Sequence, residues 1–171
     1  MRNRGFTIVE LLIVIVVIAI LAAISIVAYN GVQNRANDSA LKSDLRNVAN
    51  QIEAASVDLG AYPYGASQLT PLNLKVSKSV YGKGFILSSL EYNLIYCRVS
   101  VGSPPTKFAL VASSKSGNTF VYKEGSVQDY PRTTFDSGNS STICNGAGIT
   151  QVGTNDRDIF FIQSNWASYI N

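Results

Sequence analysis

The chain has 171 residues, with 14 Lys and Arg against 11 Asp and Glu, and its formal net charge is +3. This balance provides no strong electrostatic attraction to nucleic acid, and the length allows one membrane anchor and one small globular domain. Histidine, the commonest general base and a frequent metal ligand, does not occur in the chain. Because no other catalytic constellation is found either, we expect no enzymatic activity, no cofactor and no bound metal.

The first predicted element is an apolar run over residues 6–28, interrupted only by Thr7, Glu10 and Ser25. Its length exceeds the ~18–20 apolar residues that span a bilayer as a helix. Residues 1–5, MRNRG, carry two arginines and no acid, which places this end in the cytoplasm and the rest of the chain outside. A secretory signal peptide would end in a small-residue cleavage site, and none follows this run. We therefore expect the run to remain in the mature protein.

Glu10 is an unusual residue inside a membrane-length apolar run. An ionisable side chain in such a place is costly and indicates a function that involves a partner. In a second interpretation, Glu10 lies near the helix N-terminus and only complements the helix dipole.

The sequence GFTIVEL at residues 5–11 resembles the GFT-x-x-E-L junction of type IV prepilins and type II secretion pseudopilins. The resemblance implies that a membrane peptidase removes residues 1–5 as a leader, by cutting between Gly5 and Phe6. The same peptidase would then methylate the new amino group of Phe6. Glu10 would become the fifth residue of the mature chain.

In these families the apolar helix polymerises, so the resemblance implies that Phe6 and Glu10 take part in subunit assembly. The Glu10 carboxylate of one subunit would pair with the Phe6 amine of a neighbour inside a filament. Removing one partner of a buried pair costs about 3–5 kcal/mol, because the other charge is left unpaired. Such a pair would favour a single axial offset between subunits.

Residues 29–60 are predicted to continue the helix as an amphipathic segment that ends at Gly60, before Pro63. Its apolar positions recur in steps of four and three, as a single helical stripe requires, at Leu41, Leu45, Val48, Ile52, Ala55 and Leu59. The opposite face is expected to be solvated and carries Arg35, Asp38, Lys42, Arg46, Gln51, Glu53 and Asp58. Val27 stands where many pilins have a proline, which is a departure from the family pattern.

Residues 61–171 are predicted to form an extracytoplasmic, β-rich globular head. Strands are expected over residues 91–101, 107–113 and 119–123, as an antiparallel meander with one face covered by the long helix. A short strand and a tucked-in tail are expected near the C-terminus. The predicted fold class is therefore α+β, with a long N-terminal helix packed on a small antiparallel sheet.

Two further groups of residues leave alternatives open. Cys97 and Cys144 both fall on the exported side, where a disulfide forms readily, but two free buried thiols would also satisfy the sequence. Lys75, Lys78 and Lys83 form a basic run that would suit DNA phosphates or an anionic surface; a solvated loop is the alternative.

Two loops rich in oxygen ligands, residues 136–140 and 155–158, would suit calcium by composition. Neither follows a regular ligand spacing, which favours polar surface loops.

The first functional hypothesis is a structural subunit of a type IV pilus filament that supports adhesion, motility or DNA uptake. Its expected partners are identical or related pilin subunits, a prepilin peptidase, a membrane assembly platform and, before assembly, the lipid bilayer. The chain would lie in the cytoplasmic membrane and then in a cell-surface filament. The alternative is a pseudopilin of a type II secretion or competence apparatus. A membrane-anchored binding domain that never polymerises is a third hypothesis, and Glu10 argues against it because a simple anchor gains nothing from a carboxylate.

Overall fold

The computed structural model describes residues 6–63, 65–87, 90–99, 106–137, 139–150 and 157–159. The chain divides into two compact units, residues 1–36 and residues 37–171, which we name the anchor unit and the head unit. Helix α1 (Ile8–Leu59) provides most of the described part of the anchor unit and continues into the head unit.

Helix α1 begins and ends at residues that suit its termini. It is unbroken through Asn30 and Gly31, although both residues have low helix propensity. Gly60 follows the helix with a φ of +69°, a left-handed conformation that glycine adopts without strain. The predicted end of the helix at Gly60 is therefore confirmed.

The head unit is built on a five-stranded antiparallel sheet in the order β6-β5-β4-β3-β7. Its strands are β3 (Leu94–Arg98), β4 (Phe108–Ser113), β5 (Thr119–Lys123), β6 (Ser126–Tyr130) and β7 (Arg157–Ile159). A separate hairpin pairs β1 (Phe85–Leu87) with β2 (Leu90–Tyr92). The short helices are α2 (Gly65–Leu69), η1 (Thr70–Leu72), η2 (Lys78–Val80), α3 (Arg132–Phe135) and α4 (Ser140–Gly146).

This arrangement confirms the predicted α+β class and corrects the strand predictions in three places. Strand β1 was not predicted. The single strand expected over residues 91–101 is divided at Asn93 into β2 and β3, which belong to different sheets. Strand β6 was not predicted, because its sequence SVQDY is mostly polar and most of its side chains are exposed at the sheet edge. The tail expected after β7 lies outside the described residues.

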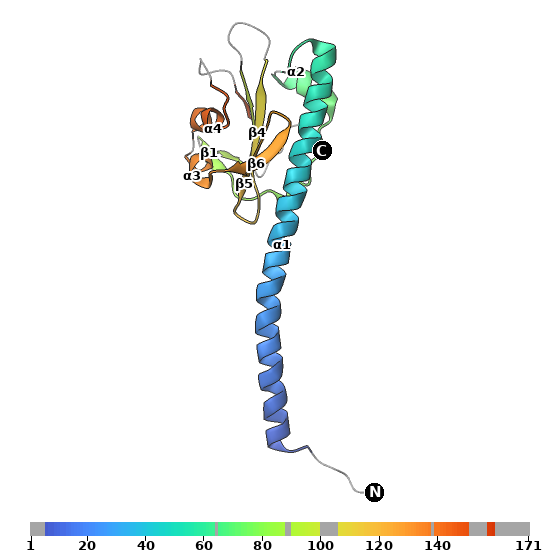
Figure 1. The fold of residues 1–171 in the computed structure, drawn as a ribbon, viewed down its shortest axis with the longest axis vertical. Helices are drawn as coiled ribbons and strands as arrows, with labels where there is room; N and C mark the ends of the chain where they lie inside the picture. The colour runs from blue at the N-terminus through green and yellow to red at the C-terminus, as the bar shows by residue number, and fades with distance from the viewer. Residues whose placement is uncertain are drawn as a thin grey trace. The chain divides into compact units, whose positions relative to one another are not determined.

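Both faces of the sheet are covered. The long helix covers one face, as predicted, and the cover of the second face was not predicted. Leu41, Leu45 and Ile52 of α1 belong to the core on one face, together with side chains such as Tyr96 and Leu110. Residues of α3, α4 and the following loop, namely Phe135, Ile143 and Ile149, belong to a second core on the other face. Figure 1 accordingly shows α3 and α4 on the side of the sheet opposite to the part of α1 that belongs to the head unit. Strands β3 and β4 are consequently buried at every position.

Polar contacts also fasten the second half of α1 to the sheet. The Asp38 carboxylate accepts a hydrogen bond of 2.8 Å from the Asn118 amide in the β4–β5 turn. The Glu53 carboxylate accepts one of 2.7 Å from the Tyr122 hydroxyl. Lys42 places its amino group 4.3 Å from the centre of the Phe120 ring. The expectation of a solvated face is therefore wrong for Asp38, Lys42 and Glu53, which are only partly exposed.

Asp44 lies within this contact and is only 6% exposed. Its carboxylate accepts hydrogen bonds from the Ser77 backbone N–H at 2.6 Å and from the Ser77 hydroxyl at 3.2 Å. Burial raises the pKa of Asp44 above its ordinary value of 3.8, and these hydrogen bonds offset the increase only in part.

A disulfide joins Cys97 in β3 to Cys144 in α4 across a Cα–Cα distance of 5.4 Å. Both residues are fully buried in the second core. Of the two alternatives that the sequence left open, the structure therefore contains the bonded one. The bond fastens α4 to the sheet face that α1 does not cover.

The raised pKa of Asp44 predicts a specific pH dependence of stability. The folded chain holds this proton more tightly than the unfolded chain, so stability falls as the pH rises from 3.8 toward the raised folded value. Asp44→Asn removes this titration, and its free energy of unfolding should fall less over that interval than the wild-type value. Denaturant unfolding at closely spaced pH values measures the difference.

Asp38→Asn is the matched control, because its titration has the opposite sign. Partial burial raises the pKa of Asp38, but hydrogen bonds from the β4–β5 turn and the charge of Lys42 outweigh it and lower the pKa. This carboxylate stabilises the fold above pH 3.8 and loses that effect as the pH falls further. If Asp44→Asn has the same pH dependence of the free energy of unfolding as the wild type, the titration of Asp44 does not contribute to stability as predicted.

The disulfide predicts a large loss of stability on reduction. Cys97 and Cys144 are 47 residues apart, and the chain-entropy model gives a loop of this size about 4 kcal/mol. A reducing agent should lower the thermal midpoint of the detergent-solubilised chain. Thiol labelling of the unfolded, non-reduced chain should find no free cysteine, and two labelled thiols would refute the bond.

Candidate functional site

The candidate site is the exposed apolar surface at the start of α1, in the anchor unit. Large apolar side chains along residues 6–26 are between 48% and 85% exposed, with Val16 and Ile8 at the two limits. By length and composition alone, α1 is long and apolar enough to cross a membrane, and none of its most apolar window is buried within the chain. Full burial of one such side chain contributes about 1.5–3 kcal/mol. This surface therefore requires a cover that the described part of the chain does not provide.

Thr7 and Glu10 form a reciprocal cap at the first turn of α1. The Thr7 backbone N–H donates to Oε2 of Glu10 at 2.8 Å, and the Glu10 backbone N–H donates to the Thr7 hydroxyl oxygen at 3.2 Å. The Thr7 hydroxyl in turn donates to the same Oε2 at 2.7 Å. Because α1 begins at Ile8, Thr7 is the N-cap and Glu10 the third helical residue, as in a capping box.

The cap occupies only one oxygen of the Glu10 carboxylate. No hydrogen bond joins Oε1 of Glu10 to any residue that the structure describes. Glu10 is also exposed, so Oε1 remains accessible to a donor from another molecule. A single carboxylate can therefore cap its own helix and accept a second charged partner.

The other predicted residues of this site are placed as follows. Phe6 lies just before the cap and is 82% exposed. Gly5, on the other side of the predicted cleavage point, lies outside the described residues. The structure thus brings Glu10 together with Thr7 at the start of α1.

Thr7 is the functional residue that sequence reasoning missed. Glu10 was interpreted as a partner for another subunit or as a complement to the helix dipole, and neither interpretation used Thr7. The pattern Thr-x-x-Glu before an apolar run is a known capping-box signature and would have identified the pair.

The predicted polar loops are used inside the head unit where the structure describes them. Asp136 accepts a hydrogen bond of 2.8 Å from Arg132, and Asn139 caps α4 by accepting from the Ser141 backbone N–H. Residues 155 and 156 lie outside the described part of the chain. Within the described residues, no group of three or more His, Cys, Asp and Glu side chains lies close enough to hold a metal ion.

Comparison with known proteins finds a family motif that contains the N-terminal site. The family description "Prokaryotic N-terminal methylation motif" matches residues 1–26. The Type IV wide pilus major component PilA4 of Thermus thermophilus is 41% identical over 124 residues, which cover 72% of this chain and 89% of the relative. No solved structure matches the chain.

The two matches cover different features of the chain. The motif contains the capped start of α1 and its apolar surface, and the relative extends the similarity well beyond that segment. Together they show that this chain belongs to the type IV pilin family, whose members are structural proteins.

Proposed function

We propose that this chain is a subunit of a type IV pilus filament, inserted in the cytoplasmic membrane and later polymerised through the first part of α1. The carrying observation is an apolar helical surface that stays exposed and bears one capped carboxylate at its start. A bilayer covers such a surface before assembly, and the same surfaces of neighbouring subunits cover it in a filament. The 41% identity to a major pilus component supports a filament subunit over a pseudopilin.

Maturation is the first step of the proposal. Residues 1–5 act as a cytoplasmic leader, since Arg2 and Arg4 precede the apolar run without any acid. A prepilin peptidase removes the leader after Gly5, and the amino group of Phe6 becomes the methylated N-terminus. This step places a positive charge on the residue just before the Thr7–Glu10 cap.

Assembly is the second step, and it uses the unoccupied oxygen of Glu10. While Oε2 caps its own helix, Oε1 accepts the Phe6 amine of a neighbouring subunit. Both charges then lie among apolar side chains, where an unpaired charge is strongly unfavourable. The pair fixes the axial offset between subunits, and the apolar surface supplies the bulk of the association energy. A filament built in this way supports adhesion, motility or DNA uptake at the cell surface.

Processing is tested by the mass of the protein isolated from its own cells. We expect an N-terminal peptide that begins at Phe6 and carries one methyl group. Glycine has no side chain to obstruct a peptidase at the cleaved bond, so Gly5→Val should retain the leader. Detection of residues 1–5 on the wild-type protein would contradict the proposed maturation.

The role of Glu10 is tested with a variant that removes its negative charge but keeps its ability to cap the helix. Glu10→Gln keeps an oxygen that can cap Thr7 but removes the charge, since glutamine also serves at this position of a capping box. If Glu10 pairs with a buried amine, the loss of about 3–5 kcal/mol per contact weakens assembly by a factor of hundreds to thousands. We expect a processed subunit that stays in the membrane and forms no filaments, as counted by electron microscopy.

Thr7→Ala is the matched control for this experiment. It removes the capping hydroxyl, which costs about 1 kcal/mol, and leaves the carboxylate charge intact. Filaments should therefore still form. Normal filaments in processed Glu10→Gln cells, with their loss in Thr7→Ala cells, would show that Glu10 acts only as a cap.

A further inference from the structure

The head unit has an end that lies close in sequence to the membrane anchor. Asp38, the second residue of the unit, contacts Asn118 of the β4–β5 turn at 2.8 Å. The same turn contacts the end of η2, because the Lys115 backbone N–H donates to the Val80 carbonyl oxygen at 2.9 Å. We name the surface formed by residues 78–83 and 114–118 the near end.

The carboxylates around the near end are already engaged. Asp136 pairs with Arg132 at 2.8 Å, and Asp129 approaches the amino group of Lys42 at 3.8 Å. Asp38 accepts hydrogen bonds from the turn itself. Each of these carboxylates therefore already has a partner within the head unit.

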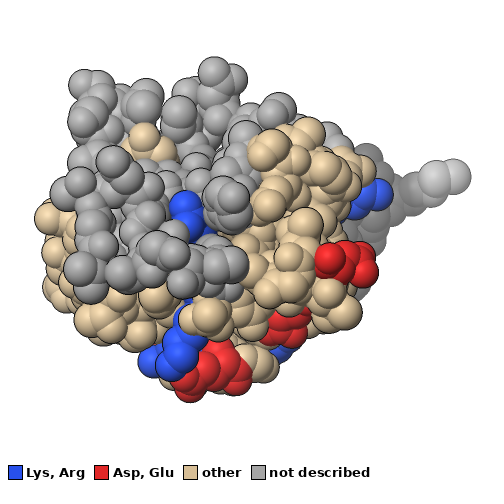
Figure 2. Space-filling model, turned by 90° about the horizontal axis from the view of Figure 1, so that it is seen from above, with Lys and Arg blue, Asp and Glu red and all other residues tan. Residues whose placement is uncertain are grey.

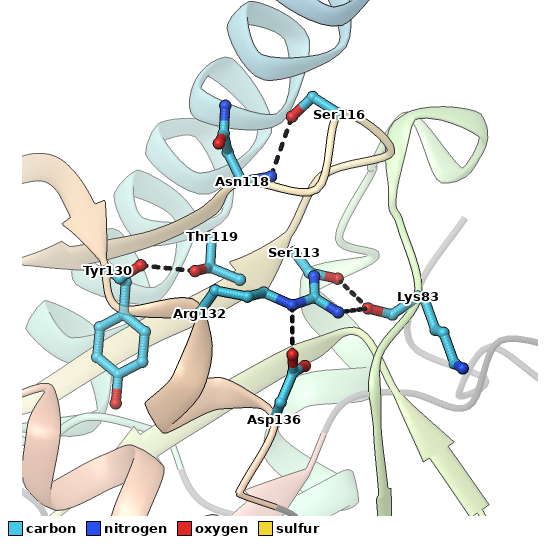
Figure 3. Close-up of polar contacts among 8 residues, drawn as sticks. All are labelled: Lys83, Ser113, Ser116, Asn118, Thr119, Tyr130, Arg132 and Asp136. Carbon is cyan, nitrogen blue, oxygen red and sulfur yellow. Dashed lines mark hydrogen bonds and ion pairs between the residues drawn. The ribbon is translucent and has the colours of Figure 1, made fainter.

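The near end carries three exposed lysines, Lys78, Lys83 and Lys115. Neither Lys83 nor Lys115 forms an ion pair with any residue in the part of the chain that the structure describes. The Lys83 carbonyl oxygen accepts hydrogen bonds from Ser113 and Arg132, while its side chain extends away from them (Figure 3). The near end thus presents a net positive charge to solvent.

The opposite end of the head unit has a different charge pattern. Lys107 and Lys123 line one pocket together with Glu53 and Glu124, so their charges are balanced locally. Figure 2, which views the head from above, accordingly shows basic and acidic groups side by side. Lys107 and Lys123 therefore serve as internal references for the near-end lysines.

The chain itself limits how far the near end can move from a bilayer. Asn37, the start of the head unit, follows closely after Ala28, the end of the apolar run. The connection spans about 14 Å as a helix and at most about 30 Å when fully extended. Headgroups occupy several ångströms beyond the hydrocarbon core, and electrostatic attraction acts over roughly a further 8–10 Å at ordinary ionic strength.

We propose that, before assembly, the near end of the head unit binds the anionic lipid surface of the membrane that holds the apolar run. Lys83 and Lys115, supported by Lys78, contact lipid phosphates, and the short connection keeps their effective concentration at the surface high. DNA also offers phosphates, but no such connection holds it beside these lysines. The contact is released when the subunit leaves the bilayer for a filament.

The test uses the full mature chain reconstituted in vesicles of phosphatidylcholine alone or with about 30 mol% phosphatidylglycerol, an anionic lipid. Acylation rates of individual lysines are measured with a soluble amine reagent and mass spectrometry. An anionic surface shifts the equilibrium of each nearby lysine toward the surface-bound state by about fivefold. We therefore expect Lys83 and Lys115 to react about fivefold more slowly in the anionic vesicles, with Lys107 and Lys123 unchanged. In about 1 M salt, where the Debye length is about 3 Å, the difference should vanish.

A pair of matched double variants supplies a second measurement. Lys83→Gln with Lys115→Gln should abolish the anionic-lipid protection of the amides at residues 114–118 against hydrogen exchange. Lys107→Gln with Lys123→Gln removes the same charge from the opposite end and should retain that protection. Unfolding measurements in detergent confirm that both double variants are folded.

Three results would overturn the inference. The first is equal slowing of all four lysines, or slowing of none. The second is protection of Lys83 and Lys115 by added duplex DNA but not by anionic lipid, which would assign the surface to nucleic acid. The third is failure of the chain to insert, measured separately by vesicle flotation and alkaline extraction. The inference rests on membrane insertion, so the third result also contradicts the proposed function, whereas the first two leave that function intact.

Discussion

The apolar surface of α1 in the anchor unit has no cover within the described chain, and the proposed life cycle of the protein depends on this constraint. Large side chains from Phe6 to Ile26 are at least 48% exposed. In the head unit the same helix behaves differently, because Leu41, Leu45 and Ile52 are fully buried against the sheet. One helix thus carries a surface that its own chain covers and another that the described part of the chain leaves exposed.

The Thr7–Glu10 cap shows how a carboxylate can be kept at the start of such a helix. The backbone N–H and the hydroxyl of Thr7 both donate to Oε2 of Glu10 and hold it in place. The first of these bonds satisfies the Thr7 N–H, which would otherwise lack a partner at the helix N-terminus. In the proposed filament the cap also orients Oε1 before the neighbouring amine arrives, so little side-chain entropy remains to be lost on pairing. Glu10, which was interpreted from the sequence as a partner for another subunit, therefore also has a role within its own subunit.

Sequence patterns predicted the elements that are determined by residues close together in the sequence. The apolar run, the stripe from Leu41 to Leu59 and the stop at Gly60 depend on residue type and spacing alone, and the structure contains the helix that they indicate. The second core was not predicted, because it requires Phe135 and Ile143, distant in sequence, to cover the far face of the sheet. Strand β6 was missed because backbone pairing with β5, and not its side chains, forms it. At the site, Glu10 was recognised by its cost in an apolar run, whereas Thr7 needed a capping pattern that was not considered.

The central claim is that Glu10 joins neighbouring subunits while it caps its own helix, and a cryo-EM structure of the filament tests this claim most directly. The account predicts that Oε1 of Glu10 lies within ion-pair distance, about 4 Å, of the Phe6 amine of an adjacent subunit. It also predicts that the Thr7 bonds to Oε2 remain in every subunit. A filament in which each Glu10 contacts only Thr7 or Phe6 of its own chain would contradict the account.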